Sequence, residues 1–187
     1  NPLAVGDRLE TDIMGAVAAG VPAMHVLTGV HMARDVIRAP RGQRPSYLAI
    51  DMRGLLEAHP APKHHRDGTW TCGVSQVAKA TRSGVLTLDD VELTEPVTIS
   101  IDSYRALAAA AWEYADGAGA APSCPEITVV GNDDPAGIVT APEPTVAPAD
   151  DDDFFDVAAN ADSLPEPGAQ TPAFLPGEEE LEELLEA

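Results

Sequence analysis

The chain has 187 residues, enough for one ordinary domain, and a formal net charge of −20 at pH 7. All eleven Lys and Arg residues lie within residues 1–105, so the negative charge gathers in the C-terminal part of the sequence. This acidity argues against a nucleic-acid partner, because phosphate binding requires clustered cations, and it argues equally against an anionic membrane surface. No run of residues approaches the roughly 20 apolar positions that are needed to cross a bilayer.

The first predicted element is a short apolar strand that ends before Asp7. Residues 2–5 are typical of the end of a buried strand, and residues 11–20 are typical of a small-residue helix that ends at a glycine. Two carboxylates, those of Asp7 and Asp12, are therefore expected at the mouth of a strand-loop-helix unit. In open α/β sheets this mouth, at the carboxyl ends of the strands, is where ligands bind.

Two further apolar runs continue this pattern, at residues 23–27 and 47–50, and each is followed by a segment with helical character. Alternation of strand and helix predicts a parallel sheet with right-handed crossovers. We therefore expect residues 1–58 to form an α/β unit. Such a unit would expose a sheet edge with unpaired backbone groups.

A polar segment with two prolines, residues 59–68, is predicted to be a linker. It contains three histidines, His59, His64 and His65, but no Cys or carboxylate stands at ligand spacing beside them, which favours a solvent-exposed linker over a metal site.

Residues 69–131 are predicted to form a small α+β extension. Its expected elements are strands at 69–74, 84–88 and 126–130 and an alanine-rich helix at 103–115. The two cysteines of the chain, Cys72 and Cys124, are far apart and not at metal-ligand spacing. We expect them to be reduced thiols in a cytoplasmic protein.

Residues 132–187 form an acidic, proline-rich tail. Eight prolines lie between Pro135 and Pro176, and the tail contains no Lys or Arg. Such a segment cannot bury enough apolar surface to offset a backbone ordering cost of roughly 1–2 kcal/mol per residue, so we expect it to be disordered. Two apolar groups within it are typical either of short recognition motifs or of sporadic apolar positions: Phe154-Phe155 and Leu181-Leu184-Leu185.

Two blocks of sequence resemble one enzyme family. The first is Val5-Gly6-Asp7-Arg8-Leu9-Glu10-Thr11-Asp12-Ile13, followed after the predicted helix by Val26-Leu27-Thr28-Gly29-Val30. It resembles the fourth motif of haloacid dehalogenase (HAD) phosphatases, most closely the NagD-like subclass. The second block, residues 44–56, is similar to the terminal strand and helix of that family. The resemblance implies the C-terminal part of a HAD-type Rossmann-like parallel sheet.

The same resemblance implies a magnesium-dependent site. Mg²⁺ is usually held by one or two protein carboxylates, with water and phosphate completing an octahedron. By resemblance, Asp7 binds the metal directly, and Asp12 acts at one remove by holding a metal-bound water or a cationic partner. Without the family, the two aspartates alone are explained by a turn and a carboxylate that stabilises a helix dipole.

Other parts of the family's machinery are not found in this sequence. The family uses an aspartate nucleophile and, two residues later, an aspartate acid/base, but Arg53 stands where the second aspartate would follow Asp51. Asp51 is better explained as a helix N-cap. We therefore expect the chain to be a C-terminal fragment of such an enzyme, inactive alone.

The intact enzyme would hydrolyse small phosphorylated metabolites through an aspartyl-phosphate, as the similar actinobacterial glycerol-3-phosphate phosphatases imply. The alternative from a different class is a non-catalytic interaction protein that uses its acidic tail to bind a partner.

Overall fold

A computed structural model describes residues 2–134 and 139–140 of the chain. These residues lie in one compact unit, Asn1–Glu143. Of the tail expected at residues 132–187, only residues 132–134 and strand β11 (Val139–Thr140) are described. The predicted disorder and the Phe and Leu motifs of the tail therefore lie outside the described residues.

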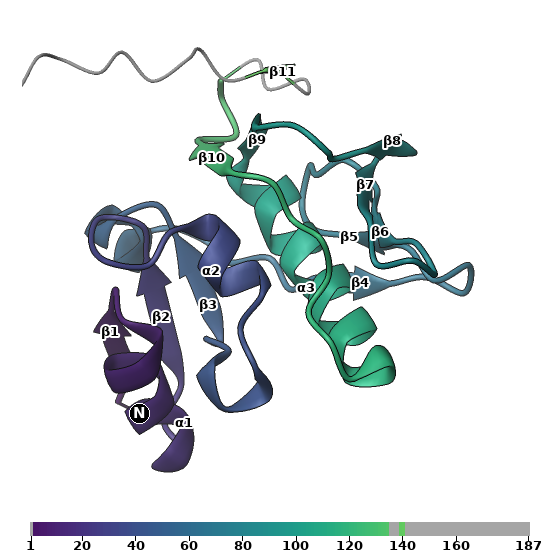
Figure 1. The fold of residues 1–187 in the computed structure, drawn as a ribbon. Helices are drawn as coiled ribbons and strands as arrows, with labels where there is room; N and C mark the ends of the chain where they lie inside the picture. The colour runs from purple at the N-terminus through teal and green to yellow at the C-terminus, as the bar shows by residue number, and fades with distance from the viewer. Residues whose placement is uncertain (1, 135–138, 141–187) are drawn as a thin grey trace, which may run out of the picture. The chain divides into compact units, whose positions relative to one another are not determined.

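A three-stranded parallel sheet forms the N-terminal part, as the sequence predicts (Figure 1). Its strands are β1 (Ala4–Gly6), β2 (Ala23–Val26) and β3 (Tyr47–Ala49), in that order across the sheet. All four residues of β2 are buried, as expected for the central strand of a parallel sheet. The α/β class predicted for this part of the chain is confirmed.

The helical segment after β1 begins earlier than the sequence predicts. A single π-helical turn, η1 (Leu9–Ile13), precedes the short helix α1 (Met14–Ala18). The π turn arises because the Ile13 amide donates to the carbonyl oxygen of Arg8, five residues back, at 3.1 Å. Gly20, with φ of 66°, follows the helix as the predicted terminating glycine. π turns are frequent at functional sites.

The other connections in this part are equally short. They are α2 (Ala33–Ile37), the 3₁₀ turn η2 (Arg41–Gln43) and the 3₁₀ helix η3 (Met52–Leu56), which follows β3.

A five-stranded antiparallel sheet follows, and two of its strands lie within the ranges 69–74 and 84–88 that were expected to be strands. Its strands, in sheet order, are β4 (Lys63–His64), β5 (Trp70–Thr71), β6 (Ala78–Ala80), β7 (Leu86–Leu88) and β8 (Val91–Glu92). Strand β4 lies inside the segment 59–68 that was expected to be a linker. The strands that were not predicted, β4, β6 and β8, have two or three residues each, which is too short for alternating hydrophobicity to reveal them.

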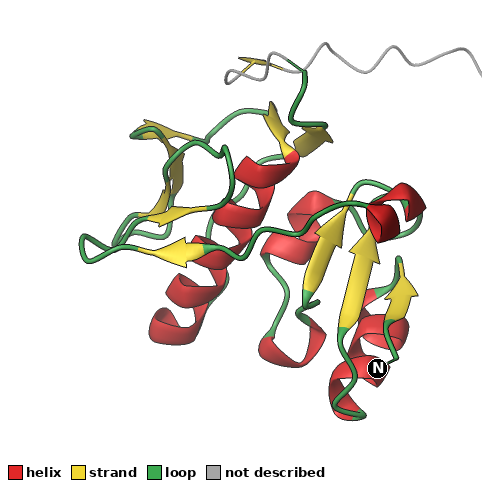
Figure 2. Ribbon diagram, turned by 180° about the vertical axis from the view of Figure 1, so that it is seen from behind, coloured by secondary structure: helices red, strands yellow, loops and turns green. Residues whose placement is uncertain are grey.

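The third sheet lies at the N-terminal end of the long helix α3 (Ile101–Ala118) (Figure 2). Strand β9 (Val97–Ser100) leads directly into α3 and pairs in parallel with β10 (Ile127–Val130). The side chain of Ser100 caps the helix by accepting a hydrogen bond from the Ser103 amide, and Gly119, with φ of 69°, ends it. The predicted helix at 103–115 is thus confirmed and longer at both ends, and β9 was missed.

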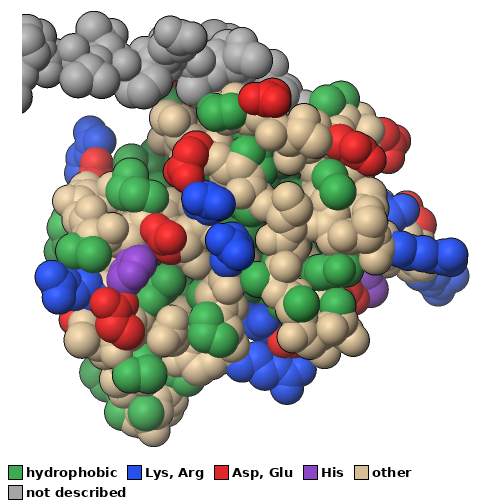
Figure 3. Space-filling model, viewed as in Figure 1, with side chains coloured by type: hydrophobic (Ala, Val, Ile, Leu, Met, Phe, Trp, Pro, Cys, Tyr) green, Lys and Arg blue, Asp and Glu red, His purple; other side chains and the backbone are tan. Residues whose placement is uncertain are grey.

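One hydrophobic core joins the N-terminal sheet to the extension. It contains Ile13 and Ile37 from the first part and Leu86 and Leu107 from the second. On the face shown in Figure 3, apolar, cationic and anionic side chains are interspersed over the two parts. In the described part of the chain, no helix is long and apolar enough to cross a membrane.

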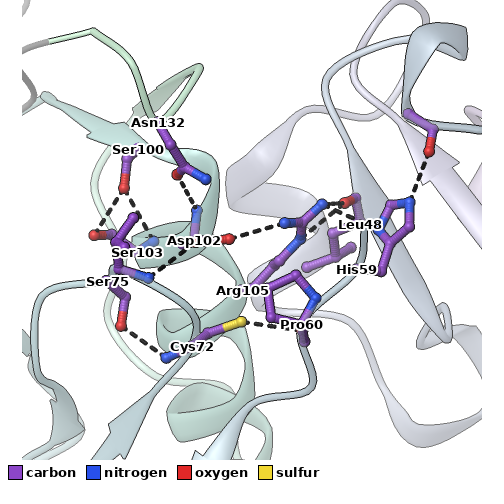
Figure 4. Close-up of polar contacts among 12 residues, drawn as sticks. Leu48, His59, Pro60, Cys72, Ser75, Ser100, Asp102, Ser103, Arg105 and Asn132 are labelled. Carbon is purple, nitrogen blue, oxygen red and sulfur yellow. Dashed lines mark hydrogen bonds and ion pairs between the residues drawn. The ribbon is translucent and has the colours of Figure 1, made fainter. Parts of the chain in front are cut away.

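Polar contacts also join the two parts, and Arg105 of α3 is at their centre (Figure 4). Its buried guanidinium pairs with Asp102 at 2.8 Å and reaches the backbone of β3 and the ring of His59. The other ring nitrogen of His59 lies 2.8 Å from the carbonyl oxygen of Gly54. His59, predicted to be a solvent-exposed linker residue, is instead part of this network, because its ring bridges η3 and α3.

Candidate functional site

Asp7 lies where the sequence predicts, at the carboxyl end of β1. Its Oδ2 accepts a hydrogen bond of 2.6 Å from the amide of Val30, in the loop that follows β2. This hydrogen bond is the main reason that the pKa of Asp7 is below its usual range. The carboxylate is therefore held in its charged form and in one orientation at the mouth of the parallel sheet.

Two glycines leave the space that the candidate carboxylates occupy. A Cβ atom at Gly29 would lie 1.8 Å from Oδ2 of Asp7, and a Cβ atom at Gly6 would lie 2.3 Å from Oδ2 of Asp12. Neither distance is possible for a real side chain without movement of the carboxylate. Both positions therefore require glycine in this arrangement.

Asp12 lies in the π turn and contacts the loop that carries Asp7. Its Oδ2 accepts a hydrogen bond from the Arg8 amide at 3.2 Å, and the Thr11 hydroxyl donates to its Oδ1 at 3.2 Å. These contacts brace the residues immediately after Asp7. Asp12 remains exposed, so its carboxylate is accessible to a water molecule or a cation.

The backbone of Asp7 is held by two histidines that the sequence analysis did not single out. The carbonyl oxygen of Asp7 lies 3.2 Å from Nε2 of His25 and also accepts a 3.2 Å hydrogen bond from the amide of His31. Burial lowers the pKa of His25 below its ordinary value, which keeps the ring neutral. His31 also accepts a hydrogen bond from the Leu9 amide through Nδ1, and its Nε2 lies 3.3 Å from Glu10.

The available ligands suit magnesium better than a transition metal. Throughout residues 2–134, no group of three or more His, Cys, Asp or Glu side chains is placed to hold a metal ion. A zinc site needs three or four such ligands, whereas Mg²⁺ is held by one or two carboxylates with water and phosphate oxygens. Within the same residues no hydrogen bond reaches Oδ1 of Asp7, so this oxygen is available to a cation.

Asp51, the other aspartate that follows a strand, has a structural role. It caps η3 by accepting a 2.8 Å hydrogen bond from the Arg53 amide, as the sequence predicts. The Arg53 guanidinium also pairs with it and is the main reason that the pKa of Asp51 is below its usual range.

The two cysteines are buried free thiols. Burial raises the pKa of Cys72 and of Cys124 to about 11. Neither thiol is therefore a nucleophile near neutral pH.

Comparison with known proteins finds similarity to one enzyme family in the N-terminal part. A family model described as HAD-hydrolase-like matches residues 1–55. The chain is also 38% identical over 111 residues to the D-glycerol 3-phosphate phosphatase of Mycobacterium tuberculosis, a match that covers 59% of this chain and 30% of the relative. Residues 1–55 of the chain are therefore similar to the HAD-like hydrolases.

Two solved structures are similar over a limited length. They are crystal structures of glycerol phosphate phosphatase from Mycobacterium tuberculosis. The complex with magnesium is 31% identical with a TM-score of 0.38, and the match covers 67% of this chain and 33% of that chain. The complex with calcium is 26% identical with a TM-score of 0.41, and the match covers 67% and 34%. The chain spans about a third of the length of these relatives.

Proposed function

We propose that Asp7 is the metal-binding carboxylate of a magnesium-dependent phosphatase that acts on small phosphomonoesters. The observation that supports this most directly is the geometry of Asp7. Its carboxylate stands at the carboxyl end of a parallel strand, is oriented by the Val30 amide and has one oxygen free. That edge of an α/β sheet is where phosphorylated ligands bind.

In this proposal, Asp7 and Asp12 have different tasks. Mg²⁺, when bound, neutralises the charge of the phosphoryl oxygens and so lowers the repulsion that an attacking carboxylate meets. Asp7 supplies a direct ligand, and Asp12 keeps the loop in place through the Arg8 amide and offers its exposed oxygens to a metal-bound water. Gly29 leaves the space that Asp7 needs.

We infer D-glycerol 3-phosphate as the substrate class from the curated relative, which is a D-glycerol 3-phosphate phosphatase. The similarity extends over 59% of this chain, beyond the 55 residues of the family model. A match of this length includes residues of the extension.

We also infer that the 187 residues alone do not hydrolyse phosphomonoesters. The sequence contains no apolar strand followed by an Asp-x-Asp-Gly motif that would supply the nucleophile and the acid/base. Loss of the nucleophile in a serine protease lowers the rate by about 10⁶-fold, and a comparable loss is expected here.

The assay is turnover of p-nitrophenyl phosphate by the purified chain with excess Mg²⁺. We expect no hydrolysis above the buffer rate. If the chain turns over the substrate and Asp7→Ala abolishes the turnover, then a nucleophile exists in these residues and the inference is wrong.

A complementation experiment tests the proposed role of Asp7. A separately expressed fragment of a relative that carries the Asp-x-Asp-Gly strand is added to the chain, so that the sheet can be completed and the carboxylates brought together. We expect Mg²⁺-dependent hydrolysis of glycerol 3-phosphate with the wild-type chain and with Asp51→Asn. Activity that survives Asp7→Asn would show that Asp7 is not the metal ligand.

A further inference from the structure

A fully buried histidine contacts the backbone of Asp7, the candidate metal ligand. His25 is in the middle of β2 and is 0% exposed, and its Nε2 is 3.2 Å from the carbonyl oxygen of Asp7. Histidine is seldom completely buried in a parallel strand, where aliphatic residues pack best. The presence of this ring in the core therefore needs a physical reason.

The contact with Asp7 fixes the tautomer of the ring. A carbonyl oxygen can only accept, so Nε2 must carry the proton and donate. Nδ1 is then the ring nitrogen that does not take part in the contact with Asp7. Nδ1 is buried, and the described part of the chain provides no hydrogen-bond partner for it. The ring thus has one buried nitrogen without a hydrogen bond, Nδ1, while the other, Nε2, donates to Asp7.

Three donors together define the position of Asp7. The His25 ring and the His31 amide both donate to its backbone carbonyl, and the Val30 amide donates to its carboxylate. His25 and Val30 belong to β2 and the loop after it, so these contacts tie the end of β1 to the end of β2. Removal of the ring donor would leave the His31 amide as the one remaining donor to this carbonyl among the described residues.

We propose that His25 is a positioning residue that holds the Asp7 backbone so that the Asp7 carboxylate meets the Val30 amide and presents its free oxygen to a metal ion. The part of this inference that concerns the metal rests on the proposed function. The part that concerns the hydrogen bonds of Asp7 does not, and it can be tested without a metal.

The first measurement is on the wild-type chain. Nitrogen NMR of the His25 ring distinguishes the Nε2–H tautomer from the Nδ1–H tautomer and from the imidazolium. We expect the Nε2–H tautomer at neutral pH. The Nδ1–H tautomer, which has no donor at Nε2, would overturn the proposal, and this test does not depend on whether any variant folds.

The second measurement is amide hydrogen exchange of Val30 in two variants. His25→Met fills the space without a donor, and His25→Gln restores a donor. We expect His25→Met to lower the protection of the Val30 amide by about tenfold and His25→Gln to keep it near the wild-type value, because only the first removes the hydrogen bond.

The matched control is Met24→Leu, a buried neighbour on the same strand whose side chain lies on the opposite face. It should leave Val30 protection unchanged. If His25→Met lowers protection equally at Val30 and at amides of β2 and β3, or if His25→Gln behaves like His25→Met, then the ring is only a packing residue and the proposal fails.

Mn²⁺ serves as the metal probe in the third measurement. In the wild-type chain, we expect Mn²⁺ to broaden the amide signals of Asp7 and Val30. In His25→Met, we expect the same broadening to require about tenfold more Mn²⁺, because the Asp7 carboxylate is no longer held in one orientation. If Val30 protection changes as expected but Mn²⁺ broadens neither amide in the wild type, then the positioning role holds and the proposed metal site fails.

Discussion

The guanidinium of Arg105 donates two hydrogen bonds to the carbonyl oxygen of Leu48, at 2.9 and 3.2 Å (Figure 4). Leu48 is in β3, so one side chain of α3 satisfies a backbone oxygen at the edge of the parallel sheet. The same guanidinium pairs with the buried carboxylate of Asp102. Arg105 therefore has two roles. It neutralises the buried carboxylate of Asp102, and it donates hydrogen bonds to the edge strand of the parallel sheet.

Replacement of Arg105 by Met should destabilise the protein strongly. Breaking a buried ion pair by removing one partner costs about 3–5 kcal/mol, because the remaining charge is left uncompensated. Urea unfolding measures the change. Arg53→Met is the matched control, since Arg53 is 84% exposed and should change the free energy of unfolding by less than about 0.5 kcal/mol. Equal effects of the two substitutions would contradict this assignment.

Asp7→Asn should weaken divalent-cation binding by the chain by at least about tenfold, because a charged oxygen ligand is replaced by a neutral one. Mn²⁺ broadening of the Val30 amide reports the binding. Asp12→Asn should have a smaller effect, since its proposed role is through water and the loop. Asp51→Asn, whose carboxylate is paired with Arg53, is the control. A response of Asp51→Asn as large as that of Asp7→Asn would indicate only general loss of negative charge.

Gly29→Ala should displace the Asp7 carboxylate, because the new Cβ atom would stand 1.8 Å from Oδ2. The expected result is loss of Val30 amide protection together with weaker Mn²⁺ binding. Gly15→Ala is the control within α1, where a Cβ atom meets nothing within 4 Å, and it should stabilise the helix by about 0.5–1 kcal/mol. Retention of Val30 protection in Gly29→Ala would show that the loop adapts.

Stability should decrease as the pH rises from about 9 to about 11. The pKa of Cys72 and of Cys124 is raised from 9.0 to about 11 in the folded protein, so the unfolded chain ionises first and is favoured as the pH rises through that range. Each thiol contributes at most about 2–3 kcal/mol. Urea unfolding at pH 8 and pH 10.5 tests this. The double variant Cys72→Ala/Cys124→Ala should show a smaller loss, and an unchanged loss would mean that the thiols ionise equally in both states.

The parallel sheet could be predicted because its strands are apolar runs separated by helical segments, and three short strands of this kind leave few topologies. Of the antiparallel sheet, β5 and β7 could be predicted as strands, whereas β4, β6 and β8 could not. Strand β4 is Lys63–His64, two exposed polar residues with no hydrophobic pattern, and it forms because β5 offers a backbone partner. The predicted division into residues 1–58, a linker and an extension remains a prediction, although β4 lies within the linker.

At the candidate site, Asp7 could be found because its neighbours form a recognisable motif. The contact that His25 makes could not be predicted, because its partner is a backbone carbonyl oxygen and a sequence does not show which carbonyl oxygen a side chain will contact. The only signal was a polar residue in the middle of an apolar run. His31 was missed for the same reason, since its hydrogen bonds are with backbone atoms of Leu9 and Asp7.

The indole of Trp112 donates to the carbonyl oxygen of Val36 at 2.9 Å, and the guanidinium of Arg34 reaches the carbonyl oxygen of Cys124 at 3.0 Å. Both hydrogen bonds cross from the stretch that matches the HAD-like family to residues that lie beyond it. A fragment that ends at residue 58 would lose both hydrogen bonds and would expose one side of the shared hydrophobic core to water. The extension therefore stabilises the stretch that matches the family, and the two parts should unfold together in one thermal transition.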